Sequence, residues 1–259
     1  MRKKKDASSG MSIWGKQVHG SLVILKKNVL LYYLKPPVLI FGVLFPVFFF
    51  LAFRMGRTVS AESVVPGMVS MALWFTATAI GPLVTPWERR ARTYERLISS
   101  PVSVRSIIAG DVLSGFAVGC RTSAIPIILG MLLTEVEIAN LPLLVGSILM
   151  GALTFSSLGV LLSAPPAASP SNIMLLSNLV RLPLLFVSGI FVPIGQMPGW
   201  AAWVAPLSPL SYTSALIRAA YGNVPYFPVW LCFPVLFLFT AVLFTISCRF
   251  HNMYRAKGL

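Results

Sequence analysis

Acidic residues, cysteines and histidines are scarce in this chain. It has 7 Asp and Glu, 3 Cys and 2 His in 259 residues. The cysteines stand singly, without the CxxC spacing of a zinc site or the dense pattern of a disulfide framework. No GxSxG, HExxH or GxGxxG motif is present. Because no acid, base or metal-ligand constellation is visible, we predict that the chain is not an enzyme and holds no metal or cofactor of its own.

One nucleotide-binding pattern is incomplete. Residues 10–16, GMSIWGK, match the first seven positions of a phosphate-binding loop. The next residue is Gln17, where that loop carries a Ser or Thr that contacts magnesium, and no apolar strand precedes Gly10. We therefore reject a nucleotide site here, and an ATP-driven activity would need a separate subunit.

Apolar residues dominate the composition. They make up 56% of the chain, and the mean hydropathy is +0.82, whereas soluble domains contain about 45–50% apolar residues. The net charge of +14 could indicate nucleic-acid binding. However, eight of the 21 basic residues precede Val38, five lie at 89–105 and three follow Cys248. Basic clusters beside apolar runs follow the positive-inside rule, so we predict a lipid bilayer as the partner and no nucleic acid.

The apolar runs predict an all-α membrane protein with six transmembrane helices. The runs cover residues 38–53 (with 30–34 before them), 64–84, 107–133, 141–163, 173–192 and 227–247, and about 20 apolar residues cross a bilayer. Six spans place both termini on one side. Because the basic clusters fall at the termini and at 85–106, we predict that this side is cytoplasmic.

We predict that residues 1–37 form a basic tail and an amphipathic helix, which precede the six-span domain, residues 38–259. The apolar residues of this helix recur at steps of three and four: Trp14, Val18, Leu22, Leu25, Val29 and Tyr32. This spacing favours an interfacial helix whose apolar side faces lipid. The alternative is that the same face packs on a partner protein.

A charged segment, residues 85–106, separates the second and third predicted spans. Thr85, Pro86 and Glu88 form the pattern of an N-cap, a first-turn proline and a capping box. We therefore predict a short cytoplasmic helix at about 85–99, bounded by Pro101. Its charged face is a candidate docking surface for a soluble partner.

Three charged residues fall inside the predicted spans: Asp111, Arg121 and Arg181. Such charges cost about 2.5–3.5 kcal/mol each on insertion scales and are functional candidates. Pairing within the bundle or snorkelling explains the first two equally well. Arg181, near the middle of its span, has the better claim, and we predict that it lines a substrate pathway together with Asn178. A second stripe, Asp111, Gly115, Gly119 and Ser123, indicates close helix packing.

Two segments carry a family resemblance. Residues 87–113, WERRARTYERLISSPVSVRSIIAGDVL, resemble the segment between spans two and three of type-2 ABC transporter permeases. The residues that fit are Glu88, Arg89, Thr93, Glu95, Leu97, Ser100, Pro101, Val102, Ser103 and Gly110. Arg90, Arg92 and Asp111 depart from the family pattern, which tends to have Glu, Gly and Lys there. Residues 181–220 look like the family's second signature through Ser188, Gly189, Pro193, Met197, Pro198, Trp200, Pro209, Leu210, Tyr212 and Arg218.

The resemblance implies a permease subunit of an ABC exporter in a prokaryotic cell membrane. It implies a second permease copy, identical or similar, and a separate ATP-binding subunit that holds ATP and magnesium. The coupling residues it implies are Glu88, Arg89, Arg92, Thr93, Glu95 and Arg96. It also implies that residues 193–225, rich in Pro and Trp, form an outer re-entrant hairpin marked by Pro193, Pro198, Trp200, Pro209 and Tyr212. A hydrophobic, drug-like or lipid-linked substrate is expected. The alternative is a six-span scaffold or assembly factor without transport.

Overall fold

The computed structural model describes residues 13–32, 61–91, 102–165 and 169–256, together with residues 40, 44, 47, 48, 52 and 93. Within these residues the chain is helical and has no strand. The α-helices are α1 (Ile13–Tyr32), α4 (Ala61–Arg90), α6 (Val104–Leu133), α7 (Leu141–Leu162), α8 (Pro170–Phe186), α9 (Gly199–Val204), α10 (Pro209–Ala220) and α11 (Val229–Ala256). Two short 3₁₀ turns, η2 (Ile194–Gln196) and η3 (Ala205–Leu207), flank α9.

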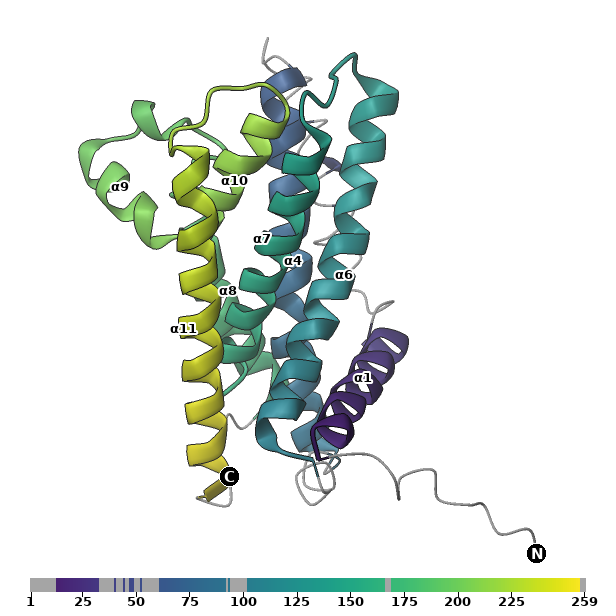
Figure 1. Cartoon of the computed structure of the whole chain (residues 1–259). Helices are drawn as coiled ribbons and strands as arrows, with labels where there is room; N and C mark the ends of the chain where they lie inside the picture. Colours follow the sequence, from purple (N-terminus) through teal and green to yellow (C-terminus); the bar gives the residue numbers. More distant parts are fainter. Residues whose placement is uncertain are drawn as a thin grey trace, which may run out of the picture.

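The long helices run side by side along the bundle, as Figure 1 shows. Four of them are long and apolar enough to cross a membrane, over Val64–Arg90, Val104–Leu133, Leu141–Leu162 and Val229–Tyr254. We call the end where α4 and α11 finish the α1 end, because α1 lies against α6 there, and the opposite end the hairpin end, because it holds α9 and α10 (Figure 1). The predicted all-helical membrane class is confirmed. The first predicted span, 38–53, lies almost wholly outside the described residues.

Capping side chains set several helix boundaries. Ser103 accepts a hydrogen bond from the Ser106 amide at the start of α6, and Asn140 accepts one from Leu143 at the start of α7. Ser169 caps α8, with Pro170 in the first turn. Each such cap contributes about 1 kcal/mol. The Pro-rich turn predicted at 164–172 therefore ends in a helix start at Pro170.

The predicted helix start at Thr85 is wrong. Residues 61–90 form one continuous helix, α4, with Pro66, Pro82 and Pro86 inside it. Thr85 is buried in its interior. A proline removes one backbone hydrogen bond and does not force an end when neighbouring helices pack around the freed carbonyl. The segment 85–90 is thus the end of the second predicted span, and only part of the predicted 85–99 helix is described.

Helix α8 is shorter than the predicted span at 173–192. It has 17 residues and ends at Phe186. Gly189 then adopts φ +81°, a left-handed conformation that favours glycine and turns the chain out of the helix. The chain continues into the hairpin segments rather than along the bundle axis.

Helix α4 forms the centre of the core. Trp74 of α4 meets Phe155 of α7 edge to face at 4.8 Å between ring centroids, and both side chains are fully buried. Further along, Gly81 and Gly159 let the two backbones touch: a Cβ on Gly81 would lie 2.3 Å from the Gly159 carbonyl oxygen. Small residues allow helices in membranes to approach this closely. The α4–α7 contact therefore depends on the absence of both side chains.

The predicted small-residue stripe on α6 packs as expected. A Cβ on Gly115 would lie 2.7 Å from the Ser156 Cβ of α7, and one on Gly119 would lie 2.8 Å from the Ala77 Cβ of α4. Asp111 of the same stripe is buried. This face of α6 is therefore a packing face within the bundle.

Helix α1 rests on α6 through polar and small residues. The polar face of α1 consists of Gln17, Ser21 and Asn28. The Ser21 hydroxyl donates to the Ser106 carbonyl at 2.8 Å, and a Cβ on Gly110 would lie 2.7 Å from the Ile24 Cβ. Val18 and Leu22 of the predicted apolar stripe are exposed, whereas Val29 of the same stripe packs against a buried cluster of α4 and α6. This exposure favours the interfacial-helix interpretation.

Candidate functional site

Glu88, at the end of α4, is held inside the protein. It is 6% exposed, and its carboxylate pairs with the Lys27 ammonium of α1. The pair joins two helices that are 61 residues apart in the chain. Since Lys27 is partly exposed, solvent weakens the pair below the value of a fully buried one. The Glu88 side chain therefore links the end of α4 to α1.

Arg89 points toward the turn between α7 and α8. Its guanidinium donates to the carbonyls of Ala164 and Pro165, each at 3.2 Å. Thr93 lies three residues beyond the end of α4, and its hydroxyl donates to the Glu88 carbonyl at 3.2 Å. In the last turn of α4, Trp87 and Arg90 are exposed, and the Arg90 guanidinium lies 5.8 Å from the Trp87 ring centroid.

The predicted coupling residues thus divide into two groups. Glu88, Arg89 and Thr93 are described and contact this chain's own helices. The side chains of Arg92, Glu95 and Arg96 lie outside the described residues. Their contact with an ATPase stays a prediction.

A buried polar cluster lies beside this link, between α1 and α6. The Asn28 amide donates to the Asp111 carboxylate at 2.7 Å and to the Ser114 hydroxyl at 3.2 Å. Asn28 and Ser114 are fully buried. Pairing within the bundle, one of the two explanations open for Asp111, is the observed one. A buried carboxylate needs such partners, so α6 and α1 are fixed to each other at the level of Lys27.

Arg181 of α8 is buried against α4. It is 6% exposed, donates to the Phe75 carbonyl at 2.8 Å and lies 5.1 Å from the Phe75 ring centroid. Asn178, one turn earlier and half-buried, accepts a longer bond from the same guanidinium at 3.4 Å. The structure therefore brings the two predicted pathway residues together, on the side of α8 that meets α4. Their pathway role stays a prediction.

The hairpin residues shape the segments between α8 and α11. Pro193 and Pro198 precede η2 and α9, and Pro209 begins α10. Trp200 is 67% exposed, as expected of a side chain at a membrane interface. Tyr212 is buried, stacks on Phe227 at 4.7 Å and donates to the Pro206 carbonyl at 3.1 Å. These residues therefore stabilise a broken helical segment at the hairpin end.

Sequence reasoning missed the partners of Glu88 and Asp111. Lys27 of α1 pairs with Glu88, and the Asn28 amide donates to Asp111, whereas the sequence predicted only an apolar stripe on this helix. The available signal was the second stripe on α1, Gln17, Ser21, Ile24 and Asn28, at steps of four, three and four. A stripe of small and polar residues indicates a helix contact within a membrane protein.

Helices as long and apolar as α4, α6, α7 and α11 cross a bilayer, so this chain is an integral membrane protein. The profile of the ABC-2 type transporter family matches residues 21–222. The match spans most of the chain and includes the second part of α1, the end of α4 and most of the hairpin. This chain therefore belongs to the ABC-2 type transporter family, whose members are membrane components of ABC transporters.

Individual relatives agree with this assignment. The inner membrane transport permease YadH of Escherichia coli K12 is 26% identical over 258 residues, which cover 96% of this chain and 95% of YadH. The nodulation protein J of Rhizobium meliloti is 26% identical over 61% of this chain and 60% of its own length. The daunorubicin resistance ABC transporter permease protein DrrB1 of Streptomyces coeruleorubidus is 32% identical over 40% of this chain and 34% of its own.

Proposed function

We propose that this chain is the permease subunit of an ABC exporter, in which two permease copies form the pathway and a separate ATPase subunit supplies the free energy. ATP and magnesium would be held by that partner. The observation that carries the proposal is the α1 end, where charged residues from α1 and α4 lie together beside the turn between α7 and α8. A movement imposed there reaches several helices at once.

The orientation follows from where the basic residues lie. Arg90 ends α4, Arg105 is in the first turn of α6 and Arg249 is near the end of α11, so all three belong to the α1 end (Figure 1). The loop between α6 and α7, at the hairpin end, carries Glu135 and Glu137 and no basic residue. By the positive-inside rule the α1 end faces the cytoplasm, and the hairpin end faces outward. With α8 and residues 38–53 as further spans, the count is six and both termini are cytoplasmic.

Coupling would pass through Glu88 and Arg89. The ATPase would meet the exposed Trp87 and Arg90 and the segment that follows. Glu88 would then carry the displacement to α1 through Lys27, and Arg89 would carry it to the turn between α7 and α8 through its bonds to Ala164 and Pro165. Two discrete arrangements of these contacts would correspond to the inward- and outward-facing states.

The substrate is proposed to be hydrophobic, drug-like or lipid-linked. One side of α8 exposes Leu175, Leu179 and Phe186, which suits an apolar pathway wall or a second permease copy. Among the relatives, DrrB1 is named for daunorubicin resistance. Arg181 lies on the other side of α8, against α4, and is proposed to select among substrates from that side.

Replacing Arg181 with Leu is expected to change the substrate range or to lower the transport rate. The change removes the cation and its bond to the Phe75 carbonyl but keeps an apolar volume in the core. The measurement is a transport profile across a panel of apolar compounds in vesicles that also contain the ATPase. Arg181→Lys keeps the charge and loses the planar fork. Its transport profile should lie between those of the unchanged chain and Arg181→Leu. An unchanged profile in Arg181→Leu would make Arg181 a structural residue only.

The direct test of the proposed function is purification of the tagged chain from its native membrane in a mild detergent. An ATP-binding cassette protein should co-purify, and the doubly substituted Glu88→Arg, Arg89→Glu chain should lose it. Trp200→Ala, at the hairpin end, is the matched control and should retain the partner. Recovery of the chain alone, or with partners that are not ATPases, would favour a membrane scaffold without transport.

A further inference from the structure

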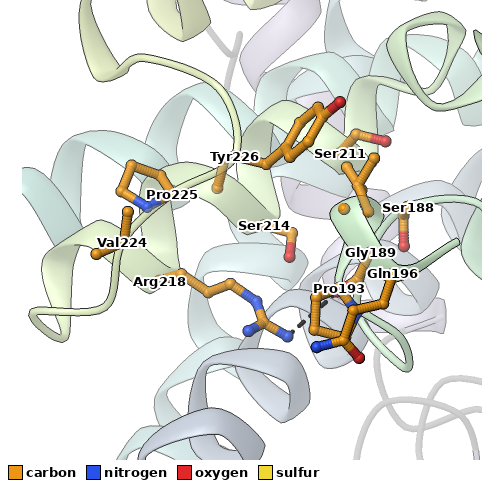
Figure 2. A pocket seen from close by; sticks show the side chains of 13 residues that line it. Ser188, Gly189, Pro193, Gln196, Ser211, Ser214, Arg218, Val224, Pro225 and Tyr226 are labelled. Carbon is orange, nitrogen blue, oxygen red and sulfur yellow. Dashed lines mark hydrogen bonds between the residues drawn. The ribbon is translucent and has the colours of Figure 1, made fainter. Parts of the chain in front are cut away.

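The hairpin end contains a cavity of about 420 Å³. Its walls come from the turn after α8, from residues 193–196, from α10 and from the loop before α11 (Figure 2). The polar lining residues are Ser188, Gln196, Ser211, Ser214 and Arg218, and none of the 13 lining residues is acidic. The cavity is therefore polar on one side and carries a positive charge without a carboxylate.

Helix α10 supplies the central polar groups. Ser211, Ser214 and Arg218 follow at steps of three and four, which places them on one face of the helix. Figure 2 shows Ser214 and the Arg218 guanidinium pointing from α10 toward the 188–196 segment. Ser211 donates its hydrogen to the Ala205 carbonyl. The Ser214 side chain is 2% exposed, and no hydrogen bond to it is found among the described residues, so its hydroxyl is available to a ligand.

The Arg218 guanidinium is incompletely used by the protein. Its Nη2 donates to the carbonyls of Gly189 and Ile190 at 3.2 and 3.3 Å, which fixes the side chain in place. Its Nε is buried without a hydrogen-bond partner in the described part of the chain. A guanidinium has five N–H donors and binds carboxylate or phosphate as a planar fork. A fixed cation with unused donors at the wall of a cavity favours an anion.

We propose that this cavity binds the phosphate group of an amphiphilic molecule, with Arg218 and Ser214 as its donors. A phosphate has several acceptor oxygens, which matches a guanidinium, a free hydroxyl and the Gln196 amide better than a single carboxylate does. The cavity volume of about 420 Å³ is many times the roughly 30 Å³ that one water occupies in the liquid. The cavity therefore has room for a phosphate group and for part of the molecule that carries it. Ile194, Val224 and Tyr226 line its apolar side. The phosphate could belong to a bilayer lipid or to a soluble phosphate ester, and both would use the same donors.

The position of the cavity agrees with a lipid headgroup. The exposed Trp200 and Trp203 belong to the same hairpin, and tryptophans of this kind sit at the headgroup level of a bilayer. The assignment of this lipid to the outer leaflet rests on the orientation given under the proposed function. The binding of a phosphate in the cavity does not depend on that orientation.

The test is native mass spectrometry of the purified chain in detergent, titrated with dioleoyl phosphatidic acid. Dioleoylglycerol has the same tails without the phosphate, and glycerol 3-phosphate has the phosphate without the tails. We expect phosphatidic acid to bind and dioleoylglycerol to bind at least about tenfold more weakly, as the loss of charged hydrogen bonds implies. Binding of phosphatidic acid alone would identify a lipid as the occupant. Comparable binding of glycerol 3-phosphate would identify a soluble phosphate ester.

Two variants connect the binding to the cavity. Arg218→Gln removes the cation, and Ser214→Asp keeps Arg218 and its carbonyl bonds while it places a carboxylate beside the guanidinium. Both should weaken phosphatidic acid binding at least about tenfold, and Ser214→Asp does so even if Arg218→Gln fails to fold. Arg105→Gln, which removes an exposed arginine at the α1 end, should bind like the unchanged chain.

Equal binding of phosphatidic acid and dioleoylglycerol, or no binding of either phosphate compound, would overturn the proposal. The proposal would also be overturned if Ser214→Asp bound phosphatidic acid as tightly as the unchanged chain. The same holds if Arg105→Gln lost as much phosphatidic acid binding as Arg218→Gln or Ser214→Asp. The assay needs no ATPase, so its failure is distinguishable from failure of the transport function, which the purification experiment tests separately.

Discussion

Replacing Gly81 with Ala is expected to prevent α4 and α7 from packing and to cause most of the protein to be lost from the membrane. The new Cβ would lie 2.3 Å from the Gly159 oxygen and 2.4 Å from its carbonyl carbon. These are backbone atoms and cannot rotate away, so the helices must separate along their buried contact. Overpacking of a core typically costs about 1–3 kcal/mol and occasionally more, and we expect the upper end here. The measurement is the free energy of unfolding in detergent, with membrane abundance as a second readout.

The chain offers matched controls for this prediction. Gly159→Ala should behave like Gly81→Ala, because its Cβ would lie 2.5 Å from the Thr78 oxygen. Gly195→Ala and Gly199→Ala add the same methyl group where no atom lies within 4 Å, and both should unfold like the unchanged protein. If Gly81→Ala unfolded like these controls, the α4–α7 contact would be looser than described.

Replacing Glu88 with Arg is expected to leave the protein in the membrane and to abolish coupled transport. The substitution places a second cation against Lys27 and releases α1 from the end of α4. The pair is only partly buried, so its loss should lower the free energy of unfolding by about 1–3 kcal/mol and should not unfold the bundle. The measurement is ATP-driven uptake by inverted vesicles that contain the ATPase, compared with ATP hydrolysis in the same vesicles.

Charge exchange separates the role of the ion pair from that of Glu88 alone. The double variant Lys27→Glu, Glu88→Lys restores opposite charges and should recover a large part of transport. Arg249→Glu reverses an exposed charge near the end of α11, outside the segment proposed to meet the ATPase, and should leave transport unchanged. Full transport in Glu88→Arg would show that the link between α1 and α4 is not needed for coupling. Failure of the exchanged pair to recover would assign the effect to Glu88 itself.

Helices with uniform apolar runs could be predicted closely. The predicted runs at 107–133 and 141–163 correspond to α6, Val104–Leu133, and α7, Leu141–Leu162. Both lie between clear signals: a capping Ser or Asn precedes each helix, a polar segment follows α6 and a Pro-rich segment follows α7. Local sequence determines such boundaries because the cap and the first turn are adjacent in the chain.

Boundaries that depend on neighbouring helices could not be predicted. Thr85 and Pro86 carry every local sign of a helix start, yet α4 continues through them because α6 and α7 pack around it. The Gly81–Gly159 contact, the Lys27–Glu88 pair and the cavity at Arg218 each join segments far apart in the chain. A single sequence supplies the residue types for these contacts but not their pairing.

The polar face of α1 has a consequence for how the chain is made. Asn28 leaves the ribosome 83 residues before its partner Asp111, and Ser21 leaves it 85 residues before Ser106. During that interval the Ser21 hydroxyl can bond the Gln17 carbonyl of its own helix, but the Asn28 amide has only water, and an unpaired amide in hydrocarbon costs several kcal/mol. The nascent helix must therefore stay at the bilayer surface while α4 is inserted, and it docks only after α6 has been synthesised. Chains that terminate before residue 104 lack α6 and would keep this polar face without its partner.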